Sequence, residues 1–190
     1  MLLSLILLAC SKSQKDGQHA SVYTLNNKKI DAFSFLPSTK ATVFVFTAID
    51  CPISNRYAPR LNELMQKYSN QDVSFYLVYT DKDETSKSIA EHVKEYQFSC
   101  SAVRDLNLAL VNISGVQVTP EVAVYRADGE LSYRGRIDNR YVDFGKSRPI
   151  PTVHDLDAAL SALISDKVPE IMRTTAVGCY IPLKKTSFQE

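Results

Sequence analysis

An unbroken run of apolar, β-branched and aromatic residues, Ala-Thr-Val-Phe-Val-Phe-Thr-Ala, occupies residues 41–48. A strand that is covered on both faces has this continuous pattern, whereas a half-exposed strand alternates between apolar and polar residues. The run therefore predicts a central strand of a sheet with a layer of other structure on each side. A second run of the same kind, at residues 73–79, predicts a neighbouring buried strand.

Helical periodicity follows each of these two strands. Behind the first, apolar residues recur at steps of three and four, which places them on one face of a helix. These residues are Ile53, Tyr57, Leu61, Leu64, Met65 and Tyr68. Residues 84–96 predict a charged amphipathic helix, residues 105–111 a short helix that ends near Gly115, and residues 153–164 a last helix.

The remaining strand patterns complete the expected fold class. Residues 22–31 predict an edge strand or hairpin, and residues 121–126 a third core strand, which an Asp-Gly turn joins to residues 131–136. Strands that alternate with helices and then close with a hairpin and a helix predict an α/β sandwich with a mixed sheet. The chain of 190 residues suits one such domain, from residue 19 to residue 168.

Charge and histidine content exclude two classes of function. Lys and Arg number 22 and Asp and Glu 21, a net charge of +1, and no long basic run would attract nucleic acid locally. His19, His92 and His154 lie far apart in the sequence, so no short-spaced zinc motif exists. We expect no metal, no other cofactor and no nucleic-acid partner.

The N-terminal residues predict export. Residues 2–9 are apolar but too few to span a bilayer, which needs about 20 residues, and a signal peptide has this pattern. Leu7-Leu8-Ala9-Cys10 resembles the lipobox of bacterial lipoproteins, in which the cysteine is lipidated. Residues 1–18 would then be signal and polar tether, and the domain would face the periplasm, held to the membrane by the lipid alone. The alternative is a hydrophobic terminus with an incidental cysteine.

Cys51 is the residue whose chemical role is clearest from the sequence. It follows the first buried strand, and Pro52 would be the first residue of the next helix, a position where proline is favoured. The Cys51 sulfur would lie at the positive end of the helix dipole, which stabilises a thiolate and lowers the thiol pKa. Ser54, one turn later, has a hydroxyl that can donate to the same sulfur.

These features resemble the thioredoxin superfamily. A buried strand, Cys51-Pro52-Ile53-Ser54 at a helix start, Pro59 within that helix, and Val118-Thr119-Pro120 before a strand together carry the resemblance. It implies a three-layer α/β/α sandwich, with Pro120 in the cis form and, beside Thr119, facing the reactive cysteine.

Three segments are similar to a bacterial redoxin-like subgroup of the alkyl hydroperoxide reductase and thiol-specific antioxidant branch. They are residues 51–57, 135–141 and 177–182. The resemblance implies a thiol oxidoreductase of the cell envelope, acting on a thiol or disulfide of a protein partner or on a peroxide. Ser54 replaces the second cysteine of a Cys-x-x-Cys motif, and Phe44 and Ala48 replace the proline and the Thr or Ser that precede the cysteine in peroxiredoxins. The first change disfavours a standard dithiol enzyme, and the second disfavours a peroxidase.

Cys179 is the predicted partner of Cys51. It lies in the tail of residues 169–190, beyond the predicted domain. A bond between the two would close a long loop, worth about 5 kcal/mol in the chain-entropy model. The pair is therefore either a nucleophile with its resolving thiol or a permanent staple of an exported domain. Cys100 is expected to be a buried free thiol.

Several alternatives remain open from the sequence. The domain could reduce peroxides, handle copper, or keep the fold without the chemistry, although Asn55 replaces the second cysteine that copper chaperones of this fold carry. Asp50 either accepts a proton or raises the pKa of Cys51. The arginines between Arg134 and Arg148 form an ion-pair network or approach the sulfur, and His92 is expected on a solvated helix face. Electron donor, direction of electron flow and oligomeric state are not predicted.

Overall fold

The structure, a computed structural model, describes residues 18–182. At its centre lies β3 (Ala41–Thr47), which is buried at every position. It pairs in parallel with β4 (Val73–Tyr79) and antiparallel with β7 (Glu121–Arg126). The prediction of buried central strands is therefore confirmed, and the mixture of parallel and antiparallel pairs confirms the mixed sheet.

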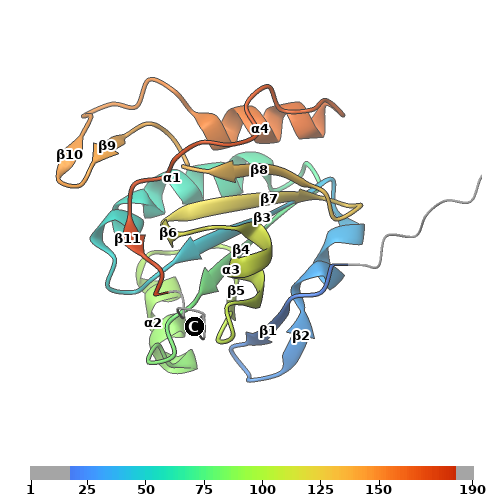
Figure 1. The fold of residues 1–190 in the computed structure, drawn as a ribbon, viewed down its shortest axis with the longest axis vertical. Coiled ribbons are helices and arrows are strands. Elements are labelled where there is room, and N and C mark those ends of the chain that lie inside the picture. Colours follow the sequence, from blue (N-terminus) through green and yellow to red (C-terminus); the bar gives the residue numbers. More distant parts are fainter. Residues whose placement is uncertain (1–17, 183–190) are drawn as a thin grey trace, which may run out of the picture.

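The sheet has seven strands in the order β2-β1-β5-β4-β3-β7-β8 (Figure 1). The outer strands are β1 (Ser21–Thr24), β2 (Lys29–Asp31), β5 (Ser101–Arg104) and β8 (Leu131–Gly135). β1 and β2 form the predicted edge hairpin, and β7 and β8 form the hairpin predicted from the Asp-Gly turn.

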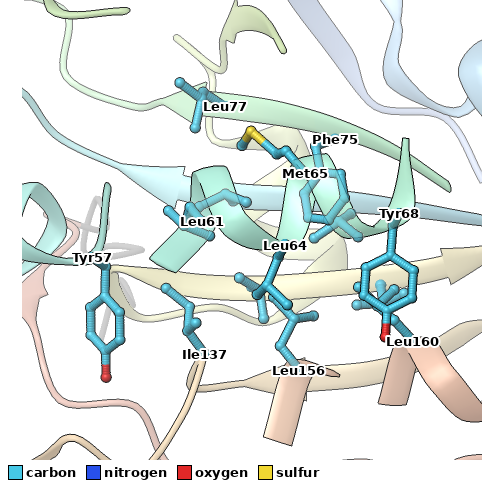
Figure 2. Close-up of a cluster of buried hydrophobic side chains, with 14 of the residues drawn as sticks. Tyr57, Leu61, Leu64, Met65, Tyr68, Phe75, Leu77, Ile137, Leu156 and Leu160 are labelled. Atoms are coloured by element: carbon cyan, nitrogen blue, oxygen red, sulfur yellow. The ribbon is translucent and has the colours of Figure 1, made fainter. Parts of the chain in front are cut away.

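Each face of the sheet has its own hydrophobic cluster. On the face of Val43 and Val45, the cluster is completed by α1 (Pro52–Tyr68), α2 (Ser86–Glu95) and α4 (Asp155–Ile164). Figure 2 shows side chains of α1 between β4 and α4. On the face of Phe44 and Phe46, α3 (Ala109–Ser114) and the 3₁₀ helix η1 (Ala32–Ser38) cover the sheet. The three layers are those expected for an α/β/α sandwich.

Two predicted helix starts lie too early in the sequence. Thr85 is the N-cap of α2 and accepts from Ser88 N, so Glu84 lies outside the helix. Asp105 precedes α3, and its carboxylate accepts from the backbone N–H groups of Ala109 and Val111. In both places a polar side chain binds the free N–H groups of a first turn, and these contacts set the helix boundary.

The segment after α4 returns to the sheet. It runs beside β8, where Arg134 N donates to Met172 O and Thr174 N donates to Arg134 O, both at 3.0 Å. It then forms β11 (Cys179–Tyr180), which pairs antiparallel with β6 (Val118–Thr119) (Figure 1). The C-terminal segment is thus packed against the domain up to Ile181, which is buried.

Between β8 and α4, a small hairpin forms from β9 (Tyr141–Asp143) and β10 (Lys146–Ser147). Among the described residues, no helix is long and apolar enough to cross a membrane. The predicted signal, tether and lipidation site at Cys10 lie outside the described residues.

Candidate active site

Cys51 lies where the chain passes from the central strand into the first helix. It is the N-cap of α1, Pro52 occupies the first helical position, and Asn55 N donates to Cys51 O at 3.0 Å. The side chain makes no capping hydrogen bond, so the sulfur is available beside the free N–H groups of the first turn. The predicted position of Cys51 at a helix start is confirmed.

The sulfur of Cys51 faces a second sulfur. Cys51 Sγ lies 2.9 Å from Cys179 Sγ and 3.1 Å from the carbonyl oxygen of Thr119, and both cysteines are free thiols. A disulfide bond is about 2.05 Å long, so this is a contact between two thiols. Cys51 is 1% exposed, and the C-terminal segment contributes Cys179 to the contacts around its sulfur. The structure brings together residues that are separated by more than half of the chain.

The position of Cys179 follows from strand pairing and from one glycine. Cys179 is the register partner of Thr119 in the β11–β6 pair. Gly178 approaches the same residue so closely that a Cβ atom there would lie 2.1 Å from Thr119 O. Only a residue without a side chain allows the segment to lie this close to β6.

The loop opposite the sulfur is held by buried charges. The Thr119–Pro120 bond is cis, as the family resemblance implies. Glu121, directly after it, accepts from Gln117 N at 2.8 Å and lies 3.5 Å from the guanidinium of Arg134. These contacts fix the ends of β6 and thereby the edge on which β11 lies.

The two thiols have opposite pKa shifts. Burial by itself raises the pKa of Cys51, but the contacts with Cys179, with the hydroxyl and backbone of Ser54, and with the Thr119 side chain outweigh it and lower the pKa. Burial, the contact with Cys51, the Cys51 charge and the Asp50 charge together raise the pKa of Cys179 to about 12. The pair therefore ionises first at Cys51.

Ser54 takes the place that the sequence predicts, on α1 one turn after Cys51. Its hydroxyl is buried and has no hydrogen-bond partner in the ordinary distance range within residues 18–182. The Cys51 sulfur is thus the acceptor towards which this hydroxyl can turn, in agreement with the lowered pKa of Cys51.

A polar network behind the loop of residues 48–50 was not expected from the sequence. Ile49 N donates to Glu84 Oε1 at 2.6 Å, and Ile49 O accepts from Asn55 Nδ2 at 2.8 Å. Asn55 Oδ1 contacts His92 Nε2 at 2.9 Å, and His92 Nδ1 contacts the Tyr79 hydroxyl at 2.7 Å. The prediction that His92 is solvated is wrong: it is 3% exposed, because its face of α2 packs towards α1 and β4.

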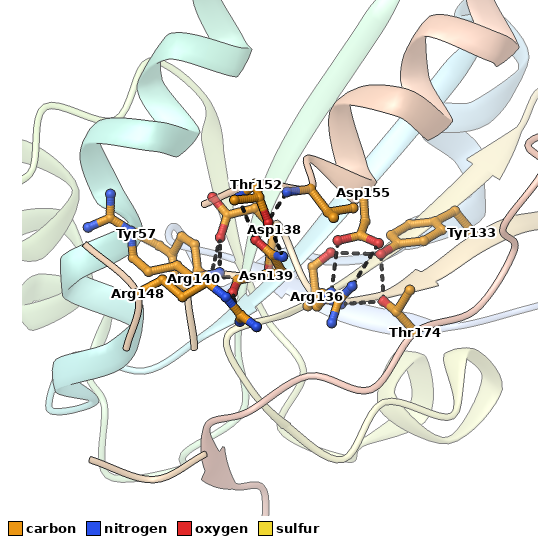
Figure 3. A network of polar contacts seen from close by, with 11 residues as sticks. Tyr57, Tyr133, Arg136, Asp138, Asn139, Arg140, Arg148, Thr152, Asp155 and Thr174 are labelled. Carbon is orange, nitrogen blue, oxygen red and sulfur yellow. Dashed lines mark hydrogen bonds and ion pairs between the residues drawn. The ribbon is translucent and has the colours of Figure 1, made fainter. Parts of the chain in front are cut away.

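The arginine-rich segment forms a network of ion pairs and hydrogen bonds (Figure 3). Arg136 pairs with the buried carboxylate of Asp155 at 2.8 Å, and Asp138 accepts from the Tyr57 hydroxyl at 2.7 Å. Arg148 donates to the carbonyl oxygen of Asn139 at 2.8 Å. In the part of the chain that the structure describes, none of these arginines binds Cys51, so the interpretation as a structural network is favoured.

Other candidates are separate from the thiol pair. Cys100 lies just before β5, is half-buried, and burial raises its pKa to about 12. Within residues 18–182, no group of three His, Cys, Asp or Glu residues is arranged to hold a metal ion.

Comparison with known proteins gives one family. The model of the Redoxin family matches residues 14–160, which is most of the chain. None of the curated proteins matches this sequence.

Solved structures share the fold at low sequence identity. A protein from Geobacillus kaustophilus described as an uncharacterized conserved protein is 19% identical, with a TM-score of 0.74, over 91% of this chain and 93% of that chain. A hypothetical protein from Sinorhizobium meliloti is 20% identical, with a TM-score of 0.71, over 87% and 92%. A secreted Mycobacterium tuberculosis disulfide oxidoreductase, homologous to E. coli DsbE, is 20% identical, with a TM-score of 0.53, over 78% and 96%. At these identities the likeness shows the fold, which is thioredoxin-like.

Proposed function

Since this chain belongs to the Redoxin family, which supports a thiol-oxidoreductase type of function, we propose that it exchanges thiols and disulfides through Cys51 and Cys179. Cys51 is the nucleophile and Cys179 the resolving thiol. The observation that carries the proposal is the 2.9 Å contact between the two free sulfurs at the start of α1.

The first step forms a mixed disulfide. The Cys51 thiolate attacks one sulfur of a partner's disulfide, a new S–S bond forms, and the old S–S bond breaks. The second partner sulfur leaves as a thiolate and takes a proton from water. The lowered pKa of Cys51 supplies the thiolate that this step needs.

The second step releases the partner. Cys179 loses its proton, attacks the Cys51 sulfur and forms the Cys51–Cys179 disulfide, while the first partner sulfur leaves as a thiolate and is protonated. The partner has then gained two electrons and two protons, which the two cysteines have lost. The same steps in reverse oxidise a dithiol partner.

The raised pKa of Cys179 determines which of the two cysteines reacts first. It is raised in part by the charge of Cys51. In the mixed disulfide Cys51 has no charge, so this contribution disappears and Cys179 becomes easier to deprotonate. Cys179 is thus kept protonated until Cys51 has reacted.

Access to Cys51 requires the tail to move. Cys51 is 1% exposed, and β11 has only two residues, one of which, Tyr180, is 83% exposed. A short strand with few hydrogen bonds opens at low cost. We infer that a partner reaches Cys51 when β11 lifts from β6, and that β11 returns to bring Cys179 back for the second step.

Disulfide exchange is favoured over peroxide reduction by what faces the sulfur. Cys51 lies against another thiol, and none of the described arginines binds it. Phe44 and Ala48, which stand where peroxiredoxins carry proline and Thr or Ser, lie in and just after the central strand.

The place of action is a further part of the proposal. The pattern Leu7-Leu8-Ala9-Cys10 supports export and lipidation at Cys10, which would hold the domain at the cell envelope, where disulfides persist. Incorporation of labelled fatty acid into the wild type and its loss in Cys10→Ala would support this location. Unlabelled wild-type protein in the cytoplasm would contradict it.

The mechanism is tested with oxidised glutathione and mass analysis of each cysteine. In the wild type we expect the Cys51–Cys179 disulfide, and in Cys179→Ser a glutathione that stays on Cys51. Cys100→Ser is the matched control and should behave as the wild type. An unmodified Cys51 would overturn the proposal. A Cys51–Cys179 disulfide with a potential below about −300 mV would identify a structural staple instead.

A further inference from the structure

A buried carboxyl group lies behind the loop that carries Cys51. Glu84 is in the turn between β4 and α2, and its side chain is buried. One carboxyl oxygen, Oε1, accepts from Ile49 N at 2.6 Å. The other, Oε2, is buried and has no hydrogen-bond partner within residues 18–182. Ionising a carboxyl group that has a buried oxygen without a hydrogen-bond partner is costly. The disulfide exchange proposed above does not use Glu84.

The same peptide is held from its other side, by the carbonyl oxygen of Ile49. Asn55 Nδ2 donates to Ile49 O, which leaves Asn55 Oδ1 to accept from His92 Nε2–H. Burial lowers the pKa of His92, so the ring is neutral near pH 7, and its Nδ1 then accepts from the Tyr79 hydroxyl. The neutral network fixes the carbonyl side of Ile49, and Glu84 is the ionisable contact on its N–H side.

The charged groups around Glu84 include Asp50, the residue directly before Cys51. Asp81 in the turn after β4, Asp50 beside Cys51, Arg104 on β5 and the Tyr79 hydroxyl on β4 face it. Burial, together with Asp81 and Asp50, outweighs the Ile49 N–H and Arg104 and raises the pKa of Glu84 to about 7. Asp50 also raises the pKa of Cys179, whose sulfur touches Cys51.

We propose that Glu84 is a positioning residue for Cys51, which holds the Ile49 peptide two residues before the sulfur and couples its own ionisation to that of the thiol. The inference rests on the proposed function, and it adds a proton-dependent control of the same site. Below its pKa of about 7, a protonated Glu84 holds the loop without placing a charge behind Cys51. An ionised Glu84 adds a negative charge to that of Asp50 and makes the thiolate less favourable.

The coupling is tested by titrating both groups in the reduced, full-length protein. The Glu84 carboxyl is followed by carbon NMR of labelled glutamate and assigned by its loss in Glu84→Gln. The Cys51 thiolate is followed by alkylation with iodoacetamide, read by mass analysis of the peptide that carries Cys51. Because coupling is reciprocal, the group that ionises second carries the shift. We expect either a lower Glu84 pKa in Cys51→Ser or a lower Cys51 pKa in Glu84→Gln.

Asp83→Asn is the matched control, because Asp83 is an exposed carboxylate in the same turn. It removes the same charge without touching Ile49 and should leave both titrations in place. If neither Cys51→Ser nor Glu84→Gln shifts the other group, or if Asp83→Asn shifts Cys51 as much as Glu84→Gln does, the coupling is absent and the proposal fails. These titrations require no disulfide exchange, so they are decided independently of the proposed function.

The positioning role is tested by hydrogen exchange at the Ile49 amide. Gln keeps an oxygen that accepts from Ile49 N, whereas Ala does not. We expect Glu84→Gln to keep the protection of this amide and Glu84→Ala to lose it, together with slower alkylation of Cys51 at every pH. Equal protection in both variants would overturn the positioning role. If Glu84→Ala does not fold, Glu84→Gln alone decides: protection of the Ile49 amide above that of neighbouring loop amides would support the contact, and its loss, with Asp83→Asn unchanged, would overturn the positioning role, because Gln still offers an acceptor oxygen.

Discussion

Cys51 and Cys100 are free thiols that lie beside strands of the same sheet. Burial by itself raises the pKa of each thiol. Cys100 precedes β5 and has only backbone groups, of Leu77 and of Cys100 itself, to offset burial, so its pKa rises to about 12. Cys51 follows β3 and has Cys179, Ser54 and Thr119 around its sulfur, and its pKa falls. The less exposed thiol is thus the more acidic one. Burial is the largest single influence on the pKa of each thiol, and the hydrogen-bond donors around Cys51 together reverse its direction there.

The largest expected difference is the rate of reaction of the two thiols. With a pKa of about 12, Cys100 is a thiolate in only about one molecule in ten thousand at pH 8. We expect oxidised glutathione to modify Cys51 before Cys100, even though Cys100 is more exposed. The modified fraction of each cysteine, measured by mass analysis over time between pH 6 and pH 9, checks this. Faster modification of Cys100 would mean that exposure controls the chemistry.

The second prediction concerns a variant that moves Cys179 away from the Cys51 sulfur without replacing either cysteine. In Gly178→Ala the new Cβ would meet Thr119 O at 2.1 Å, so β11 must move away from β6. We expect a loss of about 1–3 kcal/mol in the free energy of unfolding, as in other overpacked sites. The pKa of Cys51 should rise towards its ordinary value and the Cys51–Cys179 disulfide should form more slowly. Chemical denaturation and a thiol titration measure these changes.

Ala20 offers a control for that variant. It is a fully buried small residue far from the thiols in the sequence, packed in the cluster on the other face of the sheet. Ala20→Val should cost stability by overpacking and leave the Cys51 titration unchanged. A shift of the Cys51 pKa in both variants would show that general loosening, and not the position of β11, is responsible.

The sequence predicts the position of Cys51 at a helix start well and its contact with Cys179 poorly. A continuous apolar run, a Cys-Pro pair and helical periodicity are local patterns, and they place Cys51 at a helix start, as the structure shows. The contact with Cys179 depends on strand pairing across a long separation. From the sequence, one can infer only that Cys179, beside Gly178, is a possible partner of Cys51. The 2.9 Å contact and the register with Thr119 cannot be predicted from it.

Glu84 and His92 show where local patterns mislead. Both lie in a charged, helix-like stretch, which predicts a solvated helix face for His92 and a helix start for Glu84. The structure buries both, because the turn before α2 and one face of α2 pack against β4 and the loop before Cys51. This burial results from contacts with residues that are distant in the sequence, and the residue pattern within residues 84–92 does not indicate those contacts.

A third prediction concerns the hydroxyl nearest to Cys51. Ser54→Ala removes a donor that has no other partner in the described part of the chain. A hydrogen bond to a charged group is worth about 1.5–3 kcal/mol and one pKa unit about 1.4 kcal/mol, so the pKa of Cys51 should rise by about one to two units. The pH dependence of alkylation at Cys51 measures the shift, with Ser88→Ala, on the exposed start of α2, as the control. An unchanged titration would assign the low pKa to Cys179 and the helix alone.

The smallest effect is expected for Cys100→Ser. At neutral pH Cys100 is protonated in both the folded and the unfolded chain, so its ionisation contributes nothing to stability there. As the pH rises above 9, the unfolded thiol loses its proton while the folded one, with a pKa of about 12, retains it. The folded state then binds more protons, so the free energy of unfolding of the wild type falls as the pH rises. Cys100→Ser should lack this part of the fall and keep the Cys51 titration unchanged. Denaturation midpoints of the two proteins between pH 7 and pH 10.5 measure it, and parallel curves would show that the environment of Cys100 does not hold its proton, which would remove the contrast between the two thiols.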